Sequence, residues 1–117
     1  MIDLGEVVHS LAGRAGVEAV LLLSGEGLPI EHAAHGAFDS ETVAALGATL
    51  AQHAGRLGQG AGRGELVTAV LEYAGGLLVL ARAGTGNWLA ILASVDADIG
   101  PLLFALRQHR PALATLL

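Results

Sequence analysis

The residues that could carry chemistry begin with a glycine-rich stretch, Gly58-Gln59-Gly60-Ala61-Gly62-Arg63-Gly64. A loop that cradles phosphates follows a strand and precedes a helix, and its Walker form contains a lysine. Here a predicted helix precedes the stretch and a predicted strand follows it, and the chain contains no lysine. Arg63 also stands where a dinucleotide-binding loop needs its third glycine. We therefore interpret residues 58–64 as a flexible connector, and we predict no nucleotide or other cofactor.

Histidines and acids are the other candidates for catalysis or metal binding. His32 and His35 lie three residues apart and close to Asp39, and all three are ligand types for zinc. They fall where a predicted strand breaks into a loop, so no helical face holds them together, and we predict no metal site. Ser24, His32 and Asp39 have the residue types of a hydrolase triad, but no nucleophile elbow surrounds the serine. We predict no catalytic residue.

Composition narrows the class of protein. Of the 117 residues, 53% are hydrophobic and 15% are charged, and 6 basic against 11 acidic residues give a net charge of −5. Such a chain is too apolar to be disordered, and it lacks the basic face that nucleic acid requires. It contains no cysteine, its N-terminus carries acids rather than the bases of a signal peptide, and its uncharged runs are shorter than a membrane span. We expect one cytoplasmic domain over residues 1–117.

Hydrophobic periodicity and turn signals predict the elements that position these residues. Helices are expected at residues 4–15, 40–57 and 98–110, and strands at 17–23, 28–33, 65–73, 77–82 and 87–94. Asp39 and Ser40 are candidate caps of the second helix and Asp96 and Asp98 of the third, which Pro111 is expected to end. The apolar tail 112–117 is interpreted as one more docked turn. Three consecutive hairpin-linked strands indicate a mostly antiparallel sheet with helices on its faces, an α+β layered domain.

The helix predicted at residues 40–57 leaves little polar surface for water. Gly47 and Gly55 each cost about 1 kcal/mol relative to alanine in a helix interior. Close approach of another helix would explain them, and the alternative is a helix buried wholly within its own domain. One stripe of the helix is large and apolar, and a second is small: Val43, Leu46, Leu50 and Leu57 against Ala44, Ala48, Ala51 and Gly55.

The order and spacing of these elements resemble the Roadblock family, the group of dynein light chains and bacterial gliding regulators. The resemblance covers nearly the whole chain, although each matching segment is a turn or a core stripe. The segments are residues 16–23 leading into 24–30, the Ala/Leu/Gly helix ending at Leu57-Gly58, Gly64-Glu65-Leu66, the hairpin at Gly75-Gly76, Gly84-Thr85-Gly86, and Ile99-Gly100 in the last helix.

The resemblance implies a fold and a mode of assembly. Family members have a five-stranded antiparallel sheet with helices on both faces. They dimerise by placing the middle helix beside its mate and joining the middle strands into a continuous sheet. Carried onto this sequence, the helix is residues 40–57 and the strand is residues 65–73. The expected interface consists of Ala44, Gly47, Ala48, Ala51 and Gly55 of the helix with Leu66, Thr68 and Val70 of the strand.

The resemblance also implies a function, because bacterial members are similar to regulators of small Ras-like GTPases. We therefore expect a non-enzymatic homodimer whose helix layer binds such a GTPase through Gln52, His53 and Arg56. Arg56 is the only arginine placed to act as an arginine finger, and we interpret it as an ordinary helix-end residue. Trp88 and Tyr73 are interpreted as packing residues, with a partner surface as the alternative. A scaffold or sensor module without a GTPase is the alternative function, and an enzyme ranks third.

Overall fold

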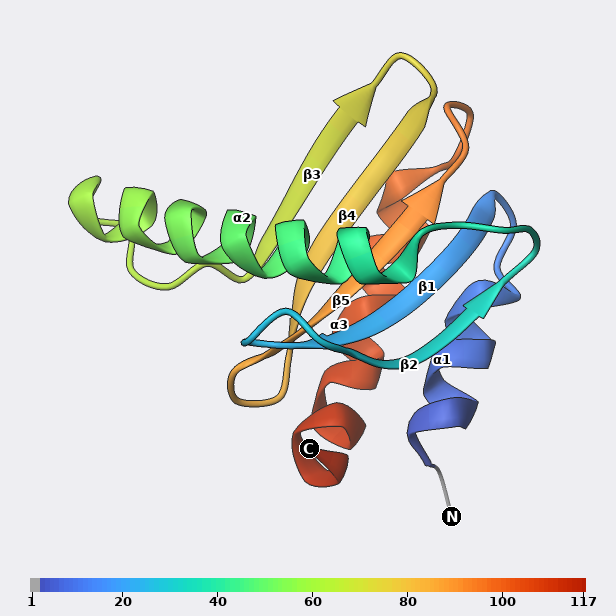
Figure 1. Ribbon diagram of the computed structural model, residues 1–117, viewed down its shortest axis with the longest axis horizontal. Coiled ribbons are helices and arrows are strands. Elements are labelled where there is room, and N and C mark those ends of the chain that lie inside the picture. The colour runs from blue at the N-terminus through green and yellow to red at the C-terminus, as the bar shows by residue number, and fades with distance from the viewer. Residues whose placement is uncertain (1–2) are drawn as a thin grey trace.

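The computed structural model describes residues 3–117, and over these residues it shows three helices and five strands (Figure 1). The order of helices and strands matches the prediction and confirms the α+β class. In chain order the elements are α1 (Leu4–Ala12), β1 (Val17–Ser24), β2 (Pro29–Ala34), α2 (Ser40–Gly60), β3 (Thr68–Tyr73), β4 (Gly76–Ala83), β5 (Asn87–Ala93) and α3 (Ile99–Leu116).

The five strands form one antiparallel sheet in the order β2-β1-β5-β4-β3. The apolar strands β1 and β5 pair at its centre, with Val20 opposite Ile91. The predicted hairpin between β3 and β4 depends on Gly76, whose φ is +153°. A side chain there would place its Cβ 2.7 Å from the carbonyl oxygen of Ala93, so this position requires glycine. Strand β3 lies at one edge of the sheet.

Helices cover both faces of the sheet, as the resemblance implied. Figure 1 shows α2 crossing one face, with α1 and α3 on the other. Alternate residues of each central strand point to opposite faces, so Leu22 packs beneath α1 and α3 while Leu21 and Leu23 pack beneath α2. Within residues 3–117 we find no helix that is both long and apolar enough to cross a membrane.

The last helix differs from the prediction, because α3 continues through Pro111 to Leu116. Proline lacks the N–H that the helix interior needs and crowds the preceding turn, which is why the sequence predicted an end at residue 110. The tail nevertheless contributes Leu113, which is 1% exposed, to the core beneath α1 and α3. Burial of this leucine offsets the lost backbone hydrogen bond, so the tail is the end of α3 rather than a separate docked turn.

Three further boundaries differ from the prediction by three residues each. Helix α1 ends at Ala12 rather than at residue 15. Helix α2 extends to Gly60, three residues past the predicted end, and β3 begins at Thr68 rather than at residue 65. The residues before β3 are still tied to the sheet, because the backbone N–H of Arg82 donates to the carbonyl oxygen of Val67 at 2.9 Å. The connector between α2 and β3 is therefore residues 61–67.

Asp39 and Asp98 cap their helices as predicted, whereas Ser40 is the first residue of α2 and Asp96 is not a cap. Asp39 caps α2 by accepting from the backbone N–H of Thr42 at 3.1 Å and from its hydroxyl at 2.6 Å. Asp98 caps α3 by accepting from the N–H of Gly100, whereas Asp96 lies in the preceding turn. The Thr42 hydroxyl, followed by its backbone N–H, lowers the pKa of Asp39 below its ordinary 3.8.

The lowered pKa of Asp39 predicts a pH dependence. Because the folded pKa lies below the unfolded one, the cap stabilises the fold fully above pH 3.8, and the contribution disappears as the pH falls through the folded pKa. We expect ¹³C NMR titration of the Asp39 carboxyl to give a midpoint below 3.8, and Thr42→Ala to raise it. Asp39→Asn keeps a good capping residue, and its stability should change less over the same pH range. An unchanged midpoint in Thr42→Ala would contradict the assignment to the hydroxyl.

Candidate functional site

The small-residue stripe of α2 faces the sheet of its own chain. Ala44 is 0% exposed and Ala51 is 5% exposed, and both belong to the core between α2 and the sheet. A Cβ at Gly47 would meet Leu23 at 3.6 Å and Leu80 at 3.7 Å. Side chains buried in this way have no area left for a second chain. The alternative of a helix packed within its own domain therefore describes Ala44 and Ala51, whereas Gly47 is half-buried.

The other two members of the small stripe lie at its margin. Ala48 and Gly55 are half-buried, and a Cβ added at Gly55 would meet nothing within 4 Å. Helix α2 is held close to the sheet near Ala45, where Gly27 of the β1–β2 turn has a φ of +88° and an added Cβ would lie 3.1 Å from the Ala45 Cα. The C-terminal part of α2 projects past β3 in Figure 1, so this end of the helix overhangs the sheet edge.

Exposed apolar side chains gather on α2 and on the strand edge beneath it. Leu57, on the overhanging end, is 74% exposed. Of the residues that the resemblance assigned to the strand interface, Val70 is exposed, whereas Leu66 and Thr68 are half-buried. Folding of residues 3–117 thus leaves unused apolar surface on and beside these two elements: Leu46, Leu57, Val67, Val70 and Tyr73.

An apolar groove of about 180 Å³ lies between α2 and the strands β3 and β4. Its walls are almost entirely hydrocarbon, and two of its residues, Leu46 and Tyr73, are more than half exposed. The residues that define it are Val43, Leu46 and Leu50 of α2 with Leu71, Tyr73 and Leu78 of the sheet. Tyr73 is not packed in the core, because 56% of the residue is exposed. The alternative interpretation, that Tyr73 marks a partner surface, stays a prediction.

The three residues expected to bind a partner, Gln52, His53 and Arg56, are all exposed on α2. Two of the three, Gln52 and Arg56, line a cavity of about 390 Å³ beside α2, and His53 does not. The same cavity is lined by Arg82 and Trp88, which stand directly opposite each other on β4 and β5. Sequence reasoning did not select Arg82, although the short turn at residues 84–86 is the signal that places residues 82 and 88 in one pair.

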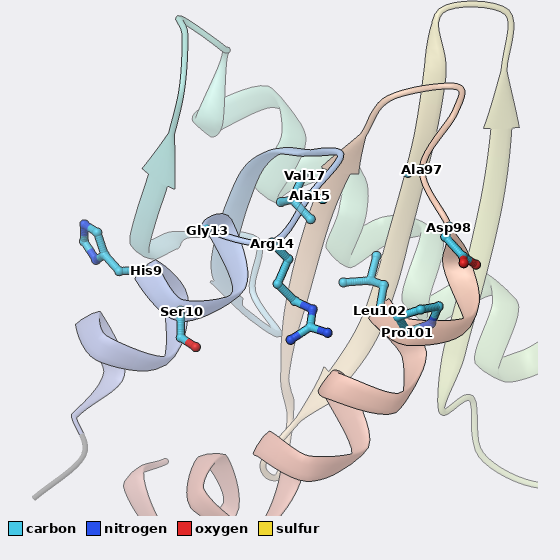
Figure 2. A pocket seen from close by; sticks show the side chains of 10 residues that line it. All are labelled: His9, Ser10, Gly13, Arg14, Ala15, Val17, Ala97, Asp98, Pro101 and Leu102. Atoms are coloured by element: carbon cyan, nitrogen blue, oxygen red, sulfur yellow. The ribbon is translucent and has the colours of Figure 1, made fainter.

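A second cavity, of about 570 Å³, lies between the end of α1 and the start of α3. Figure 2 shows Arg14 extending into the space between the two helices, beside Leu102 and Pro101, while His9 points away from them. Its lining holds one guanidinium and, at the cap of α3, the carboxylate of Asp98. The mixed charge does not select a ligand of one sign.

The residues that could have formed a hydrolase triad have local structural contacts. The Ser24 hydroxyl accepts from the backbone N–H of Leu28 at 3.1 Å, Asp39 caps α2, and the His32 ring lies edge-on to Phe38 with centroids 5.9 Å apart. The ring of His35 is hydrogen-bonded to the carbonyl oxygen of Ala12. Among residues 3–117 no three side chains of the metal-ligating types come together.

The fold and the exposed surface define a class of protein, an α+β domain whose edge strand and overlying helix present unpartnered apolar groups. Comparison with known families identifies the family: the Roadblock/LC7 domain model matches residues 3–93, and the chain belongs to this family. A comparison with curated proteins found no match.

Solved structures agree with the family assignment. A Roadblock/LC7 domain from Streptomyces avermitilis is 27% identical, with a TM-score of 0.81 over 96% of this chain and 98% of that one. MglB from Myxococcus xanthus is 20% identical, with a TM-score of 0.88 over 96% of this chain and 92% of that one. The gliding protein MglB from Thermus thermophilus is 21% identical, with a TM-score of 0.86 over 95% and 85%. At these identities the two MglB structures support the fold.

Proposed function

We propose that this protein is a non-enzymatic, cytoplasmic homodimer that binds a small Ras-like GTPase and modulates its nucleotide cycle. The observation that carries the proposal is the open edge of β3 together with α2, because five large apolar residues remain exposed on these two elements and on the segment just before β3. An obligate interface typically buries about 2,000 Å² or more and is largely apolar. The exposed residues on α2 and beside β3 have this apolar character.

A two-fold axis at the β3 edge accounts for both elements together. Pairing β3 with its copy would satisfy the outer backbone groups of this strand and extend the sheet. Because α2 crosses the strands and projects past β3 (Figure 1), the same axis carries the end of α2 from the second copy over the first sheet. Leu57 on that end is then available to fill the apolar groove between α2 and the strands β3 and β4.

The helix layer of such a dimer is the surface proposed for the GTPase. Dimerisation through the apolar groove leaves the opposite side of α2, with Gln52 and Arg56, facing outward. A regulator of this kind needs no catalytic group of its own, because it can act by binding one conformation of the switch segments of the GTPase more tightly than another. The resemblance to bacterial gliding regulators supports a GTPase as the partner.

The experiment that tests this function is purification of the tagged protein from its native cells and identification of the proteins that co-elute. A small GTPase should co-elute in a nucleotide-dependent manner. One GTPase seated across the two-fold axis would block a second, so light scattering should give two of these chains to one GTPase. Co-elution of kinases or structural proteins without a GTPase would contradict the proposal and favour the scaffold.

Arg56→Ala separates two mechanisms on the captured GTPase. An arginine finger is worth about 10³–10⁵ in turnover, whereas an exposed helix-end contact is worth about 1 kcal/mol or less. Because Arg56 is exposed, we expect stimulated hydrolysis in single-turnover assays to fall by less than about tenfold. A thousandfold loss with unchanged binding would show that Arg56 acts as a finger.

A further inference from the structure

The cavity beside α2 is the most distinctive polar feature of the molecule that the proposed function does not explain. It measures about 390 Å³ and lies between the C-terminal half of α2 and two turns, β1–β2 and β4–β5. Its polar side chains come from Gln52, Arg56 and Gln59 of α2 and from Arg82 of β4, and Trp88 of β5 forms an aromatic wall.

Arg82 is held in place by neutral groups. Its Nε donates to the carbonyl oxygen of Leu66 at 3.0 Å, and its guanidinium carbon lies 4.8 Å from the ring centroid of Trp88. Trp88 is only 7% exposed, so the indole is a fixed platform. Neither contact brings a negative charge, and both leave the two terminal nitrogens of the guanidinium available. Arg82 is therefore a pre-oriented donor whose charge these contacts do not compensate.

The charge around the cavity is opposite to that of the protein. The chain has a net charge of −5 and 6 basic residues in total, yet two of its arginines line this one cavity and no aspartate or glutamate does. Two like charges facing one cavity repel each other, and an anion placed between them removes that cost. The lining therefore selects a negatively charged group from outside the chain.

The electrostatics of the cavity favour a carboxylate over a phosphate. With Nε already bonded to Leu66, Arg82 offers its two terminal nitrogens, whose spacing matches two oxygens of a carboxylate or of a phosphate, so the distinction rests on the charge of the ligand. The cavity also lies along the C-terminal part of α2, where the helix dipole is negative and opposes a doubly charged group. The amides of Gln52 and Gln59 supply further neutral donors.

We propose that this cavity binds the carboxylate of an aspartate or glutamate side chain on the protein that docks on α2, with Arg82 as the anchor, Arg56 as the second cation and Trp88 as the platform. The identity of the docking protein rests on the proposed function, whereas binding of a carboxylate does not. The cavity lies on the opposite side of α2 from the apolar groove assigned to the second copy, so dimerisation leaves it open.

The test is an NMR titration of the full-length, ¹⁵N-labelled protein with the tripeptide acetyl-Gly-Glu-Gly-amide. The Trp88 indole N–H and the Arg82 Nε–H should shift with saturation, and the matching glutamine peptide should leave both signals in place. Arg82→Gln should weaken binding by roughly tenfold or more, the size expected for a hydrogen bond to a charged group. Arg107→Gln on α3, across the sheet, is the matched control and should bind as the wild type does.

Two further measurements test the proposal independently of Arg82→Gln. Arg56 is exposed, so Arg56→Gln tests the cavity even if Arg82→Gln does not fold, and it should weaken peptide binding by roughly twofold to fivefold. Inorganic phosphate is titrated in parallel, and tighter binding of phosphate than of the peptide would overturn the assignment to a carboxylate. Equal shifts with the glutamate and glutamine peptides, or wild-type affinity in both folded variants, would also overturn it.

The results also distinguish failure of the proposed carboxylate site from failure of the proposed GTPase partner. If the protein binds the peptide but captures no GTPase, the carboxylate site is supported and the GTPase proposal is contradicted. If a GTPase is captured with the same affinity by wild type and Arg82→Gln, and the peptide does not bind, the carboxylate site is contradicted and the GTPase proposal is supported.

Discussion

Leu57→Glu is expected to convert the proposed dimer into monomers. Leu57 is 74% exposed in the single chain, so this change costs the fold little, but in the dimer it removes a buried leucine and forces a carboxylate against the apolar groove of the partner. The lost burial of about 1.5–3 kcal/mol, together with the cost of burying a charge, should weaken dimerisation by at least about 100-fold. Light scattering after gel filtration should then give one chain mass instead of two.

The matched control for Leu57→Glu is Phe104→Glu. Phe104 is 59% exposed, and it lies on α3, on the opposite face of the sheet (Figure 1). The Phe104→Glu protein should form the dimer with the wild-type dissociation constant. This result would exclude a general effect of an added charge. A Leu57→Glu protein that remains a dimer would show that the overhanging end of α2 is not in the interface.

Leu113→Ala is expected to lower the free energy of unfolding by about 2–5 kcal/mol, the usual cost of emptying a buried leucine site. Leu113 is 1% exposed and packs in the core beneath α1 and α3, although it follows a proline that should have ended the helix. Such a loss is a large part of the roughly 5–15 kcal/mol of a typical domain, and it should be visible as a lower midpoint in urea denaturation.

The control for Leu113→Ala makes the same chemical change at an exposed site. Leu28 is 63% exposed in the β1–β2 turn, and Leu28→Ala should change stability by about 0.5 kcal/mol or less. Pro111→Ala should act in the opposite direction, because it restores a backbone N–H within α3 without touching the core. Wild-type stability in Leu113→Ala would mean that α3 is not packed beyond Pro111.

The elements themselves could be predicted because their signals are local. Alternation and apolar runs identified the strands, Asp39 and Asp98 marked two helix starts, and Gly75-Gly76 marked a hairpin that the structure shows to require glycine. Each signal depends on backbone conformation over a few residues, and local sequence determines this conformation. That the five strands form one antiparallel sheet came from the family resemblance, and the structure confirms it, whereas the order of the strands within the sheet came from the structure alone.

The end of α3 shows where a local signal is overruled. Within the helix, Pro111 is unfavourable, and a sequence argument stops there. Helix α3 continues because Leu113 reaches the core beneath α1 and α3. The free energy gained by burying a leucine is about as large as the free energy that the proline costs the helix. That energy depends on a surface assembled from distant parts of the chain, so it has no local signature.

The face of α2 shows the same division between sequence and structure. Its sequence determined that the helix has a small stripe and a large one, but periodicity does not say which surface a stripe meets. Tertiary packing placed Ala44 and Ala51 against the sheet of the same chain and left Leu46 and Leu57 outside. Likewise tertiary packing placed the Arg82–Trp88 pair of the β4–β5 hairpin beside Gln52 and Arg56 of α2. These outcomes depend on which surfaces come together in space, and burial and cross-strand contact exist only once they do.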